Sequence, residues 1–258
     1  MPPEFMDISP AEPVIDIGPP PPPPPSRDPF WGYTDLLLVM GFVVASIAFI
    51  LLVTGFLVAF NSGLRDDPGP LLLPVQIAFY GFIYLALHFT LRTRYGKSVL
   101  PSLGWRRTSF NLGVAALGGA VLAFAISGLA SLLHTPQVPS PLDRFLKSPI
   151  DLALFGALAV TLAPFFEELF FRGFLQPLLS RTFGVLAGIL ITALVFGFLH
   201  APEYAWAWQY VVAVSLAGAV FGWVRVRTNS IIPSTLMHAC YNLVFVIALI
   251  VTKHVKHS

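Results

Sequence analysis

The chain has 258 residues, of which 56% are hydrophobic and only 11% are charged, and its formal net charge is +2. A soluble globular domain carries about 25% charged residues and about 45–50% apolar ones. The composition therefore excludes a soluble enzyme, a disordered protein and a nucleic-acid binder. Together with a mean hydropathy of +0.77, it predicts a polytopic membrane protein.

Residues 1–34 have no apolar periodicity and contain an unbroken run of prolines from Pro19 to Pro25. Such a segment is typical of an extended, solvated polyproline tail. It lacks the short apolar core with a basic flank that marks a signal peptide. We expect a disordered tail that acts as a plain tether, and the alternative is a docking arm for a partner.

Long apolar stretches follow this tail and predict an all-α membrane helical bundle of about seven transmembrane helices. A helix needs about 20 apolar residues to cross ~30 Å of hydrocarbon. The fifth stretch is at the lower limit of that length. The fourth is too long, and because it contains Pro164 and Pro177 we expect it to bend or to continue as a surface helix. The stretches are approximately 36–60, 71–91, 112–133, 150–180, 183–200, 204–224 and 231–252.

Small residues recur at four-residue spacing in the third and sixth stretches, which allows helix backbones to approach closely. We interpret them as packing residues without a chemical role. They are Ala115, Gly119, Ala123, Ser127 and Ser131 in the third stretch, and Gly218 and Gly222 in the sixth.

Basic residues predict the orientation in the membrane. The densest cluster lies in the 92–107 loop, which we expect to be cytoplasmic. This choice places the N-terminus in the cytoplasm and Ser258 outside, in an integral protein of the plasma membrane. The residues of the cluster are Arg92, Arg94, Lys97, Arg106 and Arg107.

Two adjacent carboxylates, Glu167 and Glu168, lie inside the fourth stretch. An ionised group near the centre of a bilayer costs several kcal/mol and is normally kept for function. Neighbours on a helix point ~100° apart, so the two glutamates cannot do the same work. Glu168 and Arg172 are spaced i and i+4, which predicts a salt bridge. Glu167 is then left without a local partner and free to act as a base, unless the cluster only ties helices together.

Two histidines lie in later apolar stretches. His200 ends the fifth, and His238 lies one helical turn before Asn242 in the seventh. A single intramembrane histidine is usually a core residue or a helix–helix hydrogen bond, but the combination with paired glutamates favours a site. By helical rise, the levels of these residues differ by at most about one bilayer half-thickness. Cys240 points away from both His238 and Asn242 on a helix and is interpreted as a packing residue.

These motifs together resemble a known family. Glu-Glu-x-x-x-Arg at 167–172, Phe-x-x-x-His at 196–200 and His-x-x-x-Asn at 238–242 follow in this order on apolar helices. They are similar to the CPBP family, the CAAX-protease and bacteriocin-processing (Abi) group of intramembrane endopeptidases. The resemblance covers residues 150–252 as a catalytic transmembrane region. Residues 35–149 match it only as apolar transmembrane helices.

The resemblance implies roles for the individual residues. Glu167 and His200 would activate a water for attack on a peptide carbonyl. His238 and Asn242 would stabilise the oxyanion, while Glu168 and Arg172 would hold the site in shape. Glu167, His200 and His238 could alternatively ligate zinc with an open fourth position. Zinc and a metal-free mechanism are equally consistent with these residue types.

The expected partners are the lipid bilayer and a peptide or protein substrate that reaches the site from the membrane or the cytosol. A CAAX protein and a bacteriocin remain open as the substrate. One rival function is a transporter in which Glu167, Glu168 and His200 relay protons or bind a cation. Transporters usually contain internal repeats, and we find none in the sequence. A second rival is a non-catalytic immunity or scaffold protein.

Overall fold

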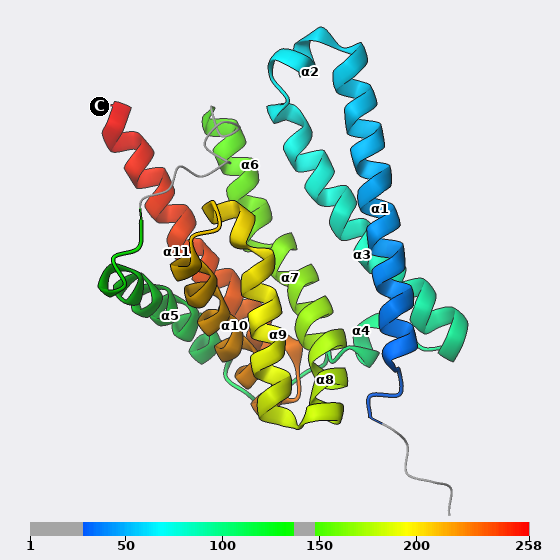
Figure 1. The fold of residues 1–258 in the computed structure, drawn as a ribbon. Coiled ribbons are helices and arrows are strands. Elements are labelled where there is room, and N and C mark those ends of the chain that lie inside the picture. Colours follow the sequence, from blue (N-terminus) through cyan, green and yellow to red (C-terminus); the bar gives the residue numbers. More distant parts are fainter. Residues whose placement is uncertain (1–27, 137–147, 258) are drawn as a thin grey trace, which may run out of the picture.

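We describe residues 28–136 and 148–257 in a computed structural model, with side chains up to residue 252. Every regular element of this part of the chain is helical, as predicted (Figure 1). The first half contains α1 (Tyr33–Phe60), α2 (Ser62–Asp66), η1 (Gly69–Leu71), α3 (Leu72–Tyr95), α4 (Val99–Ser102) and α5 (Leu112–Leu132). The second half contains α6 (Pro149–Val160), α7 (Leu162–Glu168), η3 (Leu169–Leu175), α8 (Gln176–Phe183), α9 (Val185–Leu199), η4 (Ala201–Tyr204), α10 (Trp208–Thr228) and α11 (Ile231–His257).

Six helical segments of the described chain are long and apolar enough to cross a membrane. The segment α9 is shorter, with 15 residues, which correspond to about 22 Å of helix. The prediction of about seven membrane helices therefore holds, with the fifth as the short one. In Figure 1, α1 and α3 form a hairpin beside the other helices, and α2 lies at its tip.

The long fourth stretch is divided into α6, α7, η3 and α8, so the predicted bend is confirmed. Proline removes a backbone N–H and clashes with the carbonyl four residues earlier. That residue is Val160 for Pro164, and α6 ends there. The segment η3 is a π-helix in which the Gln176 N–H bonds to the Phe171 carbonyl, five residues back. Pro177 lies in the first turn of α8, directly after this π-helix, and has no N–H to donate back into it.

The small residues bring helices close together, as predicted for most of them. Ala115 and Ala123 of α5 are fully buried, and α5 packs along α11. A Cβ on Gly119 would clash with the backbone of Met237. Ser127 and Ser131, the last small residues of this series in α5, line a cavity instead. Close packing of α5 therefore fixes the position of α11 directly beside His238.

The segment before α1 packs against the bundle. Residues 1–27 of the expected tail lie outside the described residues, whereas Trp31 is 3% exposed. The Trp31 indole N–H donates to the Phe174 carbonyl at 3.1 Å, and its ring stacks on Phe174. The Arg181 guanidinium donates to the carbonyls of Pro29 and Trp31. The end of the expected tail is thus held against η3 and α8.

Candidate active site

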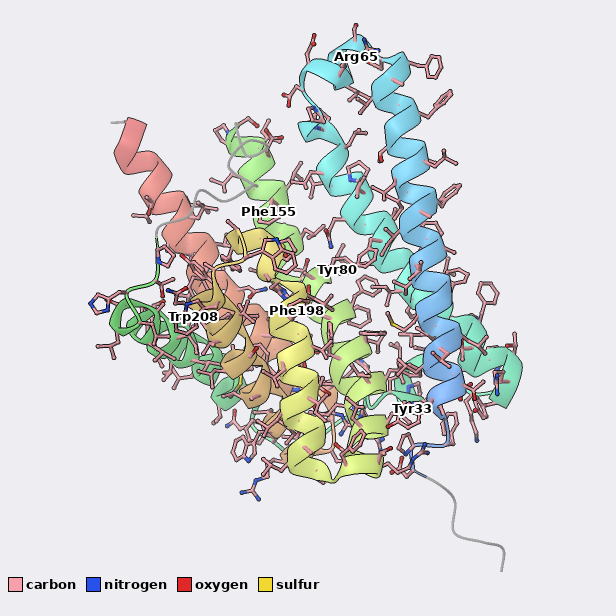
Figure 2. The ribbon with its side chains drawn as sticks, in the orientation of Figure 1. Tyr33, Arg65, Tyr80, Phe155, Phe198 and Trp208 are labelled. Carbon is pink, nitrogen blue, oxygen red and sulfur yellow. The ribbon has the colours of Figure 1, made fainter. Side chains whose placement is uncertain are left out.

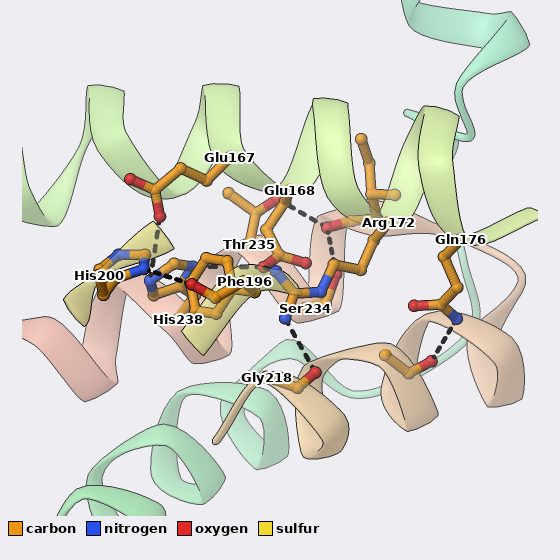
Figure 3. A network of polar contacts seen from close by, with 12 residues as sticks. Glu167, Glu168, Arg172, Gln176, Phe196, His200, Gly218, Ser234, Thr235 and His238 are labelled. Carbon is orange, nitrogen blue, oxygen red and sulfur yellow. Dashed lines mark hydrogen bonds and ion pairs between the residues drawn. The ribbon is translucent and has the colours of Figure 1, made fainter. Parts of the chain in front are cut away.

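The candidate residues surround one cavity of about 1010 Å³. Glu167 of α7, His200 at the end of α9, and His238 and Asn242 of α11 all line it. The structure therefore brings together the four residues that the sequence singled out. The close view in Figure 3 shows the Glu167 carboxyl group pointing toward the rings of His200 and His238.

Glu167 is held by a residue from the N-terminal hairpin. The Tyr80 hydroxyl of α3 donates to Glu167 Oε1 at 2.8 Å, and Tyr80 is 5% exposed. Glu167 Oε2 lies 3.7 Å from His238 Nε2, and its side chain is 16% exposed. Glu167 has no partner on its own helix, as the spacing predicts, but it does have one across the bundle. Figure 2 shows Tyr80 where α3 approaches α7.

Glu168 belongs to a buried ion pair, as predicted. Its Oε1 lies 3.0 Å from Arg172 Nη1, and both side chains are fully buried. Arg172 also donates to the Gly218 carbonyl at 2.8 Å, and its guanidinium lies 4.5 Å from the centre of the Phe196 ring. Burial of an ion pair costs less when its remaining polar atoms are also paired. Arg172 Nη2 is satisfied by the Gly218 carbonyl, whereas Arg172 Nε and Glu168 Oε2 have no hydrogen-bond partner among the described residues. The network joins α7 and η3 to α9 and α10.

The hydrogen-bond partners of the two histidines indicate which ring nitrogens carry protons. His200 Nδ1 lies 2.7 Å from the Phe196 carbonyl, which can only accept. Nδ1 is therefore the donor, and when the ring is neutral Nε2 is the free acceptor. His238 Nδ1 lies 3.2 Å from Glu168 Oε1, so it donates to a carboxylate. Its Nε2 then faces the cavity beside Glu167.

Asn242 is anchored by one of its amide hydrogens. Its Nδ2 donates to the Ala159 carbonyl of α6 at 2.8 Å. A side-chain amide has two N–H donors, so one stays available at the cavity wall. The contact also ties α11 to the end of α6, just before the break that precedes α7.

A zinc site requires several ligands that face one point. Within residues 28–136 and 148–252, no group of three or more His, Cys, Asp or Glu side chains is placed to hold a metal ion. His238 Nδ1 and His200 Nδ1 both have hydrogen-bond partners, so only the Nε2 atom of each ring remains as a possible ligand. As they stand, Glu167, His200 and His238 do not form a ligand set for a metal ion.

Two further residues at the cavity were not singled out from the sequence. Tyr80 lies in a helix that matched the family only in being apolar, and its one signal is a polar group among apolar neighbours. Glu203 of η4 also lines the cavity. Burial raises the pKa of the Glu203 carboxyl, His200 opposes that shift, and the charge of Glu167 adds to it.

The comparison with protein families agrees with the motifs. Residues 149–244 match the family model described as type II CAAX prenyl endopeptidase Rce1-like. This range contains α6 to α10 and the part of α11 that carries His238 and Asn242. No curated protein and no solved structure matches the chain.

Proposed function

We propose that this chain hydrolyses peptide bonds inside the membrane with a water activated by Glu167 and His200, in line with the match of residues 149–244 to the type II CAAX prenyl endopeptidase Rce1-like family model. The observation that carries the proposal is the convergence of Glu167, His200, His238 and Asn242 on one cavity. These residues come from three separate helical segments, and an accidental meeting of four polar groups in an apolar bundle would be costly.

The first step is deprotonation of a water in the cavity. Glu167 accepts the proton, or His200 does so at its free Nε2. The hydroxide oxygen forms a bond to the carbonyl carbon of the peptide, and the carbonyl π electrons move onto the carbonyl oxygen. The proton then passes to the departing amine as the C–N bond breaks. Tyr80 fixes one oxygen of Glu167, so the other is left for this work.

The second task is stabilisation of the oxyanion. When His238 is protonated, it donates from both ring nitrogens, one to Glu168 and the other into the cavity. The remaining N–H of Asn242 is the second donor. Donors fixed before the reaction stabilise the developing charge without reorganisation. Glu168 and Arg172 act through His238 and are positioning residues.

The shape of the cavity favours an enzyme over a channel. Its lining residues come from one half of the bundle. No described residue within 81–125, 168–195 or 222–237 lines the cavity. The inner wall is closed by buried side chains, including His238 and Phe221. A cavity that is closed at its inner end can hold a peptide segment, whereas a channel needs an opening at each end.

The test is a cleavage assay in detergent with a peptide library, with metal analysis of the same sample. We expect cleavage by the wild type and none by Glu167→Gln at matched purity and fold. Cleavage at equal rates by both proteins would overturn the assignment of Glu167. A wild type that is folded but cleaves no peptide would favour the transporter or scaffold alternative.

We also propose that the N-terminus is cytoplasmic in the plasma membrane, because the basic residues gather at one end. The Ile231 N–H bonds to the Gly104 carbonyl and the Ser230 hydroxyl bonds to that of Arg106. These contacts join the 92–107 loop to the end of α10, which carries Arg225 and Arg227. Basic residues concentrate on the cytoplasmic side.

This orientation has a consequence for entry of the substrate. His134 and Glu203 line the cavity and are exposed, so we place the mouth of the cavity at these residues, at the end opposite the basic loop. The mouth would then face the extracytoplasmic side. A cytoplasmic 92–107 loop is therefore incompatible with entry of the substrate from the cytosol through this mouth. A His134→Cys variant in a Cys240→Ala background should react with an impermeant thiol reagent in intact cells. Reaction only in inverted vesicles would overturn the orientation.

A further inference from the structure

The mouth of the cavity carries an acidic side chain that no described residue neutralises. Glu203 follows His200 by three residues, and its N–H bonds to the His200 carbonyl at 3.1 Å. Its side chain is exposed within the cavity lining. Among the described residues, its carboxylate has neither a hydrogen bond nor an ion pair. Glu203 is thus fixed next to the reacting groups but is itself free to bind.

Two aromatic rings that stack on each other follow Glu203 in the chain. Tyr204 and Tyr210 stack with their ring centres 4.3 Å apart and their planes 13° from parallel. Both line the same cavity as Glu203. The Tyr210 hydroxyl donates to the Pro136 carbonyl at 3.3 Å, which joins the start of α10 to the end of the α5 segment. A carboxylate next to aromatic faces is the combination that recognises organic cations.

The charge of the cavity also favours binding of a cation. Its acidic members are Glu167 and Glu203, and its described lining contains no lysine or arginine. Burial raises the pKa of Glu203, His200 opposes that shift and Glu167 adds to it, and because the result is still a raised pKa, the charged form of Glu203 is left short of positive charge. A cation supplied by the substrate would remove that deficit.

We propose that Glu203, with Tyr204 and Tyr210, forms a subsite for a positively charged group of the substrate peptide next to the bond that is cleaved. The proposal rests on the proposed proteolytic function and adds a class of substrate to it. The cation can be a lysine or arginine side chain or the N-terminal ammonium of the peptide. The backbone N–H of Glu203 bonds to the His200 carbonyl. A cation bound at Glu203 therefore places the neighbouring peptide bond of the substrate at Glu167 and His200.

The test compares matched peptides in which one position near the cleaved bond is lysine, norleucine or glutamate. Each peptide is used with a free and with an acetylated N-terminus, which separates a side-chain cation from a terminal one. For the wild type we expect kcat/KM about 10–100-fold higher for the cationic peptide than for its neutral match, the size of a hydrogen bond to a charged group. Glu203→Gln should bring this ratio to about one, and Glu203→Lys should favour the glutamate peptide.

The control is Asp66→Asn. Asp66 is an exposed acid of α2 that does not line the cavity, so its loss should leave the ratio at the wild-type value. The thermal midpoint in detergent is measured for every variant, and Glu203→Gln alone suffices if Glu203→Lys does not fold.

Two outcomes separate the two proposals. Cleavage by the wild type with no charge preference, or a preference that survives Glu203→Gln, overturns the subsite and leaves the proteolytic function standing. A wild type that cleaves none of the peptides overturns the proteolytic function, and the subsite falls with it.

Discussion

The buried network around Glu168 and the cavity around Glu167 begin at consecutive residues but have opposite physical character. Glu168 is fully buried and meets the charge of Arg172 at 3.0 Å. Glu167 faces a cavity, and its hydrogen-bond donor is the neutral hydroxyl of Tyr80. A carboxylate neutralised by a buried counter-ion is held in place, whereas one with a neutral donor and access to water can exchange a proton. The ~100° between neighbouring side chains on a helix thus separates a buried, paired acid from one that faces the cavity.

The largest expected effect comes from Glu167→Gln, which keeps the size of the side chain and removes the proton acceptor. Loss of a general base lowers the rate by about 10²–10⁴-fold. The thermal midpoint should stay near that of the wild type, because the amide can still accept from Tyr80. Kinetics with a cleaved peptide and thermal unfolding in detergent measure the two quantities.

Glu168→Gln should act mainly on stability. It leaves Arg172 as an unpaired cation in a fully buried site, and breaking such a pair costs about 3–5 kcal/mol. Activity should fall as well, because His238 loses the carboxylate that orients its Nδ1. Thermal unfolding of the single variant against the wild type measures the first effect.

The double variant Glu168→Gln with Arg172→Met sharpens this result. Removal of both charges should recover part of the lost stability. It should not recover activity, since the glutamine amide can accept from His238 Nδ1 but has no charge to stabilise the protonated ring. Equal loss of stability in Glu167→Gln and Glu168→Gln would mean that the two glutamates form one structural cluster, and the difference between the two regions would be withdrawn.

The sequence predicts contacts that lie within one helix better than contacts between helices. The i, i+4 spacing predicts the pair of Glu168 and Arg172, and the bend follows from Pro164. The partner of Glu167 was missed, because Tyr80 is 87 residues away in sequence. A π-helix over residues 169–175 was also missed, since a segment that is apolar on all sides carries no periodicity that could reveal it.

The N-terminal boundary was missed for a related reason. The stretch around Trp31 is short and follows a proline-rich run, so its composition indicates a tail. Its burial depends on Phe174 and Arg181, which lie far along the chain. Residues 149–244 match the family model, yet the hairpin and the segment before it supply contacts that this range does not contain.

Tyr80→Phe tests whether the hairpin takes part in the cavity chemistry. It removes the hydrogen bond to Glu167 and keeps the ring, which stacks on Phe166. A hydrogen bond to a charged group contributes about 1.5–3 kcal/mol, so kcat should fall by about 10–100-fold. KM should change little, because the hydroxyl is engaged by Glu167.

The matched control for Tyr80→Phe is Tyr84→Phe. Tyr84 lies one turn further along α3 and packs against the same Phe166 ring, so this variant should retain the wild-type kcat. An equal loss of kcat in both variants would mean that α3 contributes packing alone.

The smallest expected effect is that of Trp31→Phe, which concerns the attachment of the segment before α1 to η3. The change keeps an aromatic ring to stack on Phe174 and removes the indole N–H that donates to the Phe174 carbonyl. Loss of one such bond should lower the free energy of unfolding by about 0.5–1.5 kcal/mol.

Trp206→Phe is the control, because Trp206 is 61% exposed and a surface change is usually within about ±0.5 kcal/mol. Denaturant unfolding in detergent measures both. If the two variants are equally stable, the contact contributes nothing measurable, and the N-terminal segment lies on the bundle without supporting the part that carries Arg172. If Trp31→Phe alone is less stable, and its kcat falls with its stability, the segment before α1 helps to hold the π-helix that follows the two glutamates.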